Sequence, residues 1–484
     1  MINVLNIAFH ITPNQKCILA SLSIISITLL PSTLLLDIPS RAEGQTSMLS
    51  KPVNISNNTA NSYSPELAIS EDKNLVSNDI VHIVWNDNST GNGDIYYKRS
   101  ADNGTSFSNT QNISNNPGNS TAAKIAAYQD NVYVVWEDAT TGNGDIYLKK
   151  SLDNGTSFGT IENLSNNTSV SDSFHMAVSG SNIYVIWTDN ASGNGDIYFR
   201  KSLDNGTSFG TIENLSNDNG KSYGAHIVIS GNNVYVVWND NSTGNGDIYF
   251  KRSADNGTSF SSTQNISHNP GNSTAAKIAA YQDNVYVVWE DATTGNGDIY
   301  FKASLDNGTK FAGQKSLARN NGSSFNPQMT VSPNNIIYGM WRDDTQYDRS
   351  KNNTSDTKAI DVLYRVSLDS GRNFTTRNSI GGDIGDTANF AQIATAYNEA
   401  YSGKSNDAYV VWSDILKYRQ PASYELFFRT ITNNGTTLSD PINLSNSDGN
   451  SIIPKISVSD RVNVYVVWKE DATGNGDILF TRVK

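Results

Sequence analysis

The chain has 484 residues, of which 10% are aromatic and 17% charged, with a formal net charge of −12 and a pI near 4.9. The aromatic content suffices for a buried core, which excludes a disordered chain. The acidic balance argues against nucleic acid and anionic membranes as partners, because both would repel it. Such a length predicts two or three domains unless the chain is built of repeats.

The N-terminus combines a basic residue with an apolar run. Lys16 precedes an apolar stretch over residues 17–36, and small residues follow up to Ala42. This order predicts a signal peptide over residues 1–42, followed by a short linker over 43–50. The run is also long enough to span a bilayer, so an uncleaved membrane anchor is the alternative. In both cases we expect the rest of the chain to be extracellular or on the cell surface, with membrane contact only through this segment.

Cysteine and histidine usage limits the chemistry of the mature chain. The only cysteine, Cys17, lies in the leader, so neither a disulfide nor a thiolate metal site is expected. His175 and His226 fall inside strand-like runs, which favours a structural role, and no two histidines have metal-ligand spacing on one element. Sequons such as Asn54 and Asn88 are compatible with a glycosylated surface.

The rest of the chain is a repeat. The stretch "VVWEDATTGNGDIY" occurs word for word at Val134–Tyr147 and Val287–Tyr300, and close variants occur elsewhere. The first five tryptophans are spaced by 51 residues, and we call the whole series of tryptophans the tryptophan ladder. A period near 50 is typical of solenoids, propellers and arrays. The ladder contains all eight tryptophans: Trp85, Trp136, Trp187, Trp238, Trp289, Trp341, Trp412 and Trp468.

Each repeat predicts four short strands separated by Asn-Gly and Asp-Asn-Gly turns, which is the pattern of a propeller blade. The run "NVYVVW" at Asn131–Trp136 is apolar on both faces, as expected when a blade packs between two neighbours. The last unit ends at "DILFTRVK", Asp477–Lys484, after its third strand, whereas "KPVNISNN" at Lys51–Asn58 matches the fourth-strand text of other units. The N-terminal strand should therefore complete the last blade and cover its edge.

These patterns predict an all-β fold, a β-propeller of four-stranded blades over residues 51–484. Eight tryptophans, one in each unit, predict eight blades. Seven blades is the alternative, because the irregular sixth and seventh units need not both be complete.

A second repeated motif resembles that of a known family. "SADNGTSF" at Ser100–Phe107 recurs in later units, and it resembles the Asp-box (BNR) repeat of the sialidase superfamily, with Phe in place of Trp. The carboxylate can bind amides of its own turn, and the aromatic residue anchors the hairpin, so these aspartates are expected to be structural. They are Asp102, Asp153, Asp204, Asp255, Asp306 and Asp369. In that family the boxes lie on the face opposite the catalytic face.

The resemblance also implies what a sialidase would need: three arginines that grip a carboxylate, a Tyr–Glu nucleophile pair and an Asp acid/base. The Arg-Ile-Pro type motif of that family is not found. Arg99, Arg200 and Arg252 follow third strands, where lysines also occur, and this interchange predicts solvated blade edges and no arginine clamp. A non-enzymatic protein is therefore favoured, and a sialidase-like glycosidase is the alternative.

Two loops after tryptophans are longer than the others. They follow Trp341 and Trp412, in units six and seven, and they should lie on the face opposite the Asp-boxes. Long loops on a rigid scaffold often carry binding residues. Tolerated insertions in decayed repeats are the alternative reading. The candidate ligand-binding residues are Arg342, Asp343, Tyr347, Arg349, Tyr418 and Arg419.

Each regular copy also has one acid two residues after Trp and another nine residues after it. Oxygen-only ligands would suit calcium if the loop brought the two carboxylates together. Alternatively, the first Asp caps the turn and the second begins the next strand, and no cofactor is needed. The pairs are Asp87/Asp94, Asp138/Asp145, Asp189/Asp196, Asp240/Asp247 and Asp291/Asp298.

Near-identical blades suit an extended binding surface better than one asymmetric active site. The sequence therefore predicts a monomeric, secreted or cell-surface propeller that acts as a binding or scaffold module for glycans or cell-envelope components. The alternative is an exo-sialidase-like glycoside hydrolase with its site in blades six and seven.

Overall fold

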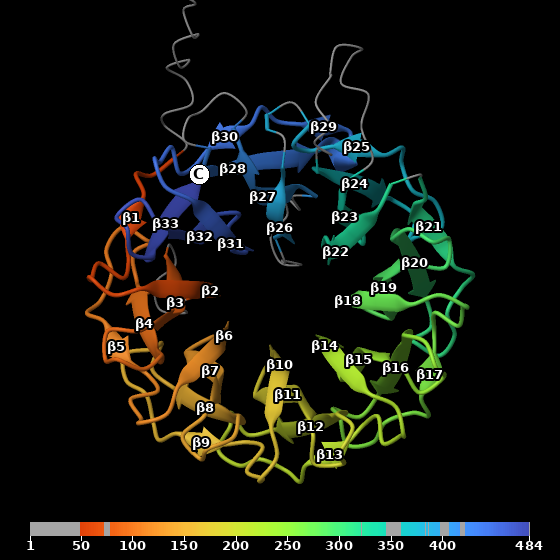
Figure 1. The fold of residues 1–484 in the computed structure, drawn as a ribbon, viewed down its shortest axis with the longest axis horizontal. Coiled ribbons are helices and arrows are strands. Elements are labelled where there is room, and N and C mark those ends of the chain that lie inside the picture. Colours follow the sequence, from red (N-terminus) through yellow and green to blue (C-terminus); the bar gives the residue numbers. More distant parts are fainter. Residues whose placement is uncertain are drawn as a thin grey trace, which may run out of the picture. The chain divides into compact units, whose positions relative to one another are not determined.

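The computed structural model divides the chain into two units, Met1–Gln45 and Thr46–Lys484, and the described residues all belong to the second. The predicted signal peptide or anchor over residues 1–42 lies outside the described residues. The described residues are 49–71, 78–320, 322–344, 360–382, 384–385, 387–396, 406–416 and 422–483. They form eight antiparallel sheets arranged as a ring of blades, which confirms the predicted eight-bladed propeller (Figure 1).

The four strands of a blade follow each other from the centre of the ring to its rim, as Figure 1 shows. The first strands are β2 (Ser62–Glu71), β6 (Ser120–Tyr128), β10 (Ser171–Ser179), β14 (Ser222–Ser230), β18 (Ser273–Tyr281), β22 (Ser324–Val331), β26 (Asn389–Thr395) and β31 (Ser451–Val458). The second strands, which carry the tryptophans, are β3 (Asp79–Asp87), β7 (Asn131–Asp138), β11 (Asn182–Asp189), β15 (Asn233–Asp240), β19 (Asn284–Asp291), β23 (Ile337–Asp343), β27 (Ala408–Ile415) and β32 (Val464–Glu470).

The outer half of each blade holds the third strand and a short fourth strand. The third strands are β4 (Asp94–Ser100), β8 (Asp145–Ser151), β12 (Asp196–Ser202), β16 (Asp247–Ser253), β20 (Asp298–Ser304), β24 (Asp361–Ser367), β28 (Tyr424–Thr432) and β33 (Asp477–Val483). The fourth strands are β5 (Gln111–Asn112), β9 (Glu162–Asn163), β13 (Glu213–Asn214), β17 (Gln264–Asn265), β21 (Lys315–Ala318), β25 (Asn378–Ser379), β30 (Ile442–Asn443) and β1 (Val53–Asn54). Blade 7 adds a 3-10 turn, η1 (Asn433–Gly435), and a further short strand, β29 (Thr437–Leu438).

The N-terminal strand closes the ring, as the sequence predicts. β1 pairs with β33, so that Val53 faces Phe480 in the ladder of the last blade. The pairing begins at Leu49, which bridges Val483. Ile55 is 1% exposed and packs in the core cluster between blades 8 and 1. The two ends of the described chain therefore share one sheet.

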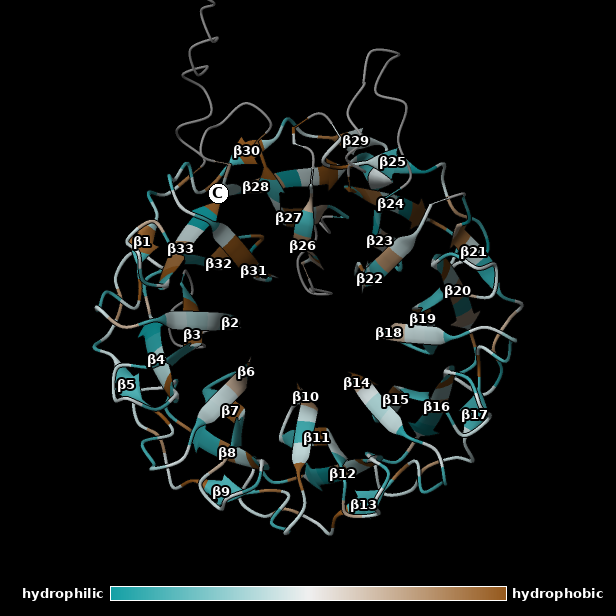
Figure 2. Cartoon of the chain, in the orientation of Figure 1, coloured by the Kyte–Doolittle hydropathy of each residue, from teal (hydrophilic) through white to brown (hydrophobic). Residues whose placement is uncertain are grey.

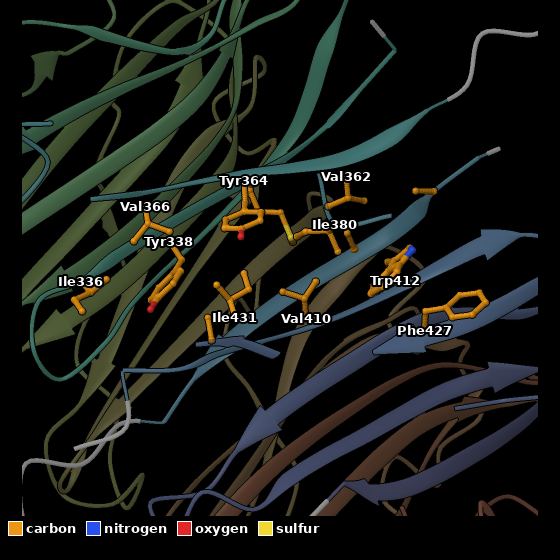
Figure 3. Close-up of a cluster of buried hydrophobic side chains, with 14 residues drawn as sticks. Ile336, Tyr338, Val362, Tyr364, Val366, Ile380, Val410, Trp412, Phe427 and Ile431 are labelled. Carbon is orange, nitrogen blue, oxygen red and sulfur yellow. The ribbon is translucent and has the colours of Figure 1, made fainter. Parts of the chain in front are cut away.

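The hydrophobic core lies between the blades. Eight clusters of buried side chains each join two neighbouring blades, so the interfaces form a closed series around the ring. Figure 3 shows one of them, where Tyr338 and Tyr364 of blade 6 face Val410 and Trp412 of blade 7. The second strands contribute side chains to the clusters on both sides, which explains why their sequences are apolar on both faces. Figure 2 shows a mainly hydrophilic rim.

Every first strand is interrupted by a bulge near the same point. Between Thr121 and Lys124, for example, the register with β7 shifts, and Ala122 adopts a left-handed φ of 55°. The equivalent residues in blades 6 and 7 are Asn326 and Phe390, with φ of 52° and 51°. Bulges of this kind redirect side chains next to functional sites, and here they lie on the innermost strand of each blade.

Strand direction alternates within a blade, so the hairpins that join third and fourth strands lie at the opposite end from those that join second and third strands. We call the first set the Asp-box face and the second set the Trp-loop face. None of the described segments forms a helix with the length and hydrophobicity needed to cross a bilayer.

Candidate functional site

The Asp-boxes form self-contained hairpins. Ser100 Oγ donates to Asp102 Oδ1 at 2.7 Å, and the backbone N–H of Gly104 donates to Ser100 Oγ at 2.9 Å. Ser106 donates both its N–H and its hydroxyl to the same carboxylate. The carboxylate is therefore engaged by its own turn. The same Ser–Asp hydrogen bond recurs at Asp153, Asp204, Asp255, Asp306 and Asp369.

The aromatic residue of each Asp-box reaches the neighbouring blade. Phe158 of blade 2 meets the ring of Tyr97 in blade 1 edge-on, with centroids 4.9 Å apart. Phe107 of blade 1 meets Phe480 of blade 8 in the same way, at 5.1 Å. The aromatic residue therefore anchors its hairpin, as expected, and it also fixes the hairpin to the preceding blade.

The basic residues of the third strands are also interblade contacts, and the prediction that they mark solvated edges is wrong. Lys149 Nζ donates to the carbonyl of Ile113 in the preceding blade at 2.9 Å, and Arg200 does the same to Leu164 at 3.0 Å. The adjacent positions reach the following blade, where Arg99 donates to the carbonyl of Asn154 in the next Asp-box at 2.7 Å. Lys and Arg interchange because both are cationic donors long enough to reach a carbonyl.

The acid pairs lie opposite each other at the ends of the second and third strands. Asp87 is the ladder partner of Asp94. The first carboxylate accepts hydrogen bonds from Ser62 at 2.6 Å and Asn58 at 2.8 Å, and the second accepts one from Ser114 at 2.9 Å. The other pairs keep this register: Asp138/Asp145, Asp189/Asp196, Asp240/Asp247 and Asp291/Asp298.

Through these contacts the acid pairs cap the loop that follows each tryptophan and hold it to neighbouring segments. Among the described residues, no cluster of three or more His, Cys, Asp or Glu is arranged to hold a metal. The two alternatives from the sequence, no cofactor and bound calcium, both stay predictions. Blade 5 departs from the pattern: Ala318 stands where blade 4 has Ser267, and the buried Asp298 Oδ1 has no hydrogen-bond partner among the described residues.

The two described candidate ligand residues have different environments. Asp343 is buried and accepts hydrogen bonds from Ser324 at 2.7 Å and from Trp341 at 3.3 Å, as the capping Asp does in regular blades. Arg342 stacks over the ring of Phe325 at 4.8 Å. The other four, Tyr347, Arg349, Tyr418 and Arg419, lie outside the described residues.

Arg342 lines a cavity of about 450 Å³ at the inner ends of blades 5, 6 and 7. Met340 and Trp341 form its apolar wall, and Phe390 contributes an aromatic ring. Phe390 is held by its bulge and by an edge-on contact with Tyr424. The polar lining consists of Lys277, Asn326, Gln328, Arg342, Asn389 and Gln392.

The floor of this cavity belongs to a ring of eight equivalent residues, which we call the channel ring. Each is the first residue paired with the second strand after the bulge of its first strand, so all eight lie at one level. Proceeding around the propeller, they are Glu66, Lys124, His175, His226, Lys277, Gln328, Gln392 and Lys455.

The channel ring was not among the sites predicted from the sequence. His175 and His226, read as structural, are ring neighbours with centroids 4.8 Å apart. The signal was available: the ring residue precedes the tryptophan by 12 positions in regular blades, as Lys124 precedes Trp136. It was hidden because the residue type changes from blade to blade.

The charges of the channel ring interact strongly. Glu66 pairs with Lys124 and, at 3.0 Å, with Lys455, and both lysines lower the pKa of Glu66 against the opposing effect of its burial. Lys277 lies 2.8 Å from His226 Nε2. Burial, and next the charges of Lys455 and Lys124, lower the pKa of Lys277 to about 8.

One buried carboxyl in blade 7 differs from its counterparts. Asp414 is 1% exposed and accepts a hydrogen bond from the backbone N–H of Thr387 at 3.1 Å. Burial, with a smaller effect of the Asp361 carboxylate, raises the pKa of Asp414 to about 7. By contrast, hydrogen bonds outweigh burial at Asp87 and hold its pKa below the usual value. Asp414 is thus a group that titrates near neutral pH, behind the Trp-loop face.

No protein-family model and no curated protein matches the chain. Solved structures with a similar ring include the polysaccharide lyase Uly1, with a TM-score of 0.47, 10% identity, and coverage of 90% of this chain and 99% of that one. The GH93 α-L-arabinofuranosidase of Fusarium graminearum has a TM-score of 0.40 and 12% identity, with 65% and 93% covered.

The NanB sialidase from Streptococcus pneumoniae is also similar, with a TM-score of 0.37, 10% identity, and coverage of 90% of this chain and 98% of that one. At such identities and TM-scores the likeness concerns the propeller fold. Neither residue roles nor substrates are carried over from these structures to this chain.

Proposed function

We propose that this propeller is an extracellular or cell-surface binding protein that takes a glycan in the cavity of blades 5–7. The observation that carries the proposal is the lining of that cavity: four carboxamides, two cations and two aromatic residues, Trp341 and Phe390, around about 450 Å³. A concave site with an apolar wall and a few convergent polar groups is typical of ligand binding.

Each part of the lining matches a part of a sugar. The carboxamides of Asn326, Gln328, Asn389 and Gln392 offer both donors and acceptors, which sugar hydroxyls require. The ring of Phe390 offers an apolar face for the C–H side of a pyranose. Arg342 and Lys277 add positive charge, which favours a sugar with an acidic group.

Binding is favoured over catalysis. Glycoside hydrolysis typically uses two carboxyl groups that flank the scissile bond. Among the described residues that line the cavity, none is Asp or Glu. The glycosidase alternative is supported by one observation, the buried Asp414 with its pKa raised to about 7, a value suited to a general acid. Turnover of a fluorogenic sialoside or arabinoside by the purified protein would establish that alternative.

The remaining parts of the proposal come from the sequence. The leader over residues 1–42 directs the chain out of the cytoplasm or anchors it, and cell-envelope polysaccharides are then accessible partners. The net charge of −12 supports neither nucleic acid nor an anionic membrane as a partner. We propose that the protein acts as a monomer and that ligand binding in this cavity requires no cofactor.

A glycan array tests the proposal with three proteins. The parent should bind a defined set of acidic glycans, and Arg342→Ala should bind them at least tenfold more weakly. Arg372→Ala is the matched control, because Arg372 is an exposed arginine in an Asp-box hairpin on the other face, and it should bind as the parent does. Absence of any bound glycan, or equal binding by all three proteins, would contradict the proposal.

A further inference from the structure

We propose that the channel ring seats an oxyanion at the floor of the cavity, against Lys277, Gln328 and Gln392. The group would be a sulfate, phosphate or carboxylate, either free or carried by the bound glycan. The inference deepens the proposed function and rests on it only for the second of these sources.

The first step is the charge of the ring. Its formal charges are those of Lys124, Lys277, Lys455 and Glu66, which leave two positive charges in excess at neutral pH. Burial, followed by the nearby lysine charges, lowers the pKa of His175 to about 4, so it is neutral there. The excess lies on the first strands, which are the innermost strands of the ring (Figure 1).

The second step is that one of these two positive charges lies at Lys277, whereas the other belongs to the group of Lys124, Glu66 and Lys455. Glu66 is engaged by Lys124 and Lys455. Among the described residues, Lys277 has no carboxylate partner, and its contact at 2.8 Å is with the imidazole of His226. Since an ammonium only donates, His226 Nε2 accepts this bond and its Nδ1 carries the proton. A partly buried cation without a counter-charge is an attractive position for an anion.

The third step is access. The cavity reaches the ring at Lys277, Gln328 and Gln392 and at none of the other five ring positions. These three neighbours offer an ammonium and two carboxamide N–H₂ groups, all donors suited to an oxyanion. Arg342 lies on the same cavity wall and adds a second cation. Blades 5–7 thus combine space, donors and a cation of the channel ring without a carboxylate partner among the described residues.

The test compares the parent with Lys277→Gln, which places in blade 5 the residue that blades 6 and 7 already have. Lys310→Gln, at an exposed Asp-box lysine, is the control. Inorganic sulfate and phosphate are titrated calorimetrically into each protein. A sulfated or uronic oligosaccharide and its neutral counterpart are titrated in parallel.

Two results support the inference. Free sulfate or phosphate binds the parent and the control, and Lys277→Gln weakens this binding at least tenfold. Alternatively, free anions do not bind, but Lys277→Gln weakens binding of the acidic oligosaccharide at least tenfold and leaves the neutral one unchanged. If Lys277→Gln changes none of these affinities, or if no anion binds in either form, the inference is overturned.

The arms also separate this inference from the proposed function. Oligosaccharide binding that depends on Arg342 and not on Lys277 would keep the glycan site and reject the oxyanion seat. Sulfate binding that depends on Lys277, without any glycan, would do the reverse.

A pH series needs no variant. The parent should lose anion affinity as pH rises through about 8, where Lys277 deprotonates. Among the described residues, the titratable groups of the channel ring around it are Lys124, Lys455, Glu66 and the two histidines, whose pKa values burial lowers. An affinity that is unchanged between pH 7 and pH 9.5 would contradict a seat built on Lys277.

Discussion

Removal of residues 49–58 should open the ring between blades 8 and 1. The deletion removes β1, the adjacent Ile55, which is 1% exposed, and two backbone hydrogen bonds outside the ladder, from Ser50 to Arg482 at 2.9 Å and from Ile55 to Ile478 at 2.7 Å. Loss of a buried aliphatic side chain costs about 2–5 kcal/mol, and each backbone hydrogen bond contributes about 1 kcal/mol. The expected loss of about 4–7 kcal/mol is a large part of the 5–15 kcal/mol that stabilises a typical protein.

Chemical denaturation measures this loss, and size-exclusion chromatography detects the aggregation that an open sheet edge promotes. A synthetic peptide of residues 49–58 should restore part of the stability by adding the missing strand in trans, whereas a scrambled peptide should not. Point variants provide a matched pair: Ile55→Ala should cost about 2–5 kcal/mol, but Val53→Ala, at a side chain 38% exposed, about 0.5 kcal/mol or less. A truncated protein that unfolds at the parent's denaturant concentration and stays monomeric would refute closure by β1.

Four further outcomes follow. Ala318→Ser should stabilise the protein by about 1 kcal/mol, measured by denaturation, because the new hydroxyl can donate to the unpartnered Asp298 Oδ1; no gain would contradict this. Asp414→Asn should remove a loss of stability, at most about 4 kcal/mol, that the parent shows as pH rises from about 4 to 7, since a raised carboxyl pKa favours the protonated folded state; equal pH profiles of melting temperature would refute it. Lys149→Met should cost about 1 kcal/mol and Lys149→Arg almost nothing, because either cation can reach the neighbouring carbonyl. Calcium titration should give no heat, and a chelator should leave the melting temperature unchanged, because the acid pairs already accept hydrogen bonds; either signal would support a calcium site.

The fold could be predicted from the sequence because its determinants are local and repeated. The tryptophan ladder, the turn sequences and the fourth-strand text at Lys51–Asn58 each describe short segments, and stacking of identical units leaves few alternatives. Eight blades and their closure follow from these patterns. The Asp-box hairpin is equally local, since Asp102 and its donors lie within the seven residues Ser100–Ser106.

The contacts between blades were harder to predict. Lys149 and Arg200 look like surface residues in the sequence, and only the packing angle of adjacent blades places their side chains against a neighbour's carbonyl. The same holds for the channel ring. Glu66, Lys124 and His175 occupy equivalent positions in their blades but have different side-chain types. The cavity is lined by the bulge residues Asn326 and Phe390. No local sequence motif predicts the left-handed backbone of these two residues. Sequence patterns thus locate blades 6 and 7 as irregular, whereas the geometry identifies which side chains meet there.

The central claim is that the cavity of blades 5–7 binds an acidic glycan. A crystal structure of the protein with the tightest-binding acidic glycan from the array tests this most directly. We predict sugar density against Phe390 and Arg342, with the acidic group near Lys277. A glycan bound on the Asp-box face or at the outer rim, with the cavity filled by solvent, would contradict the account.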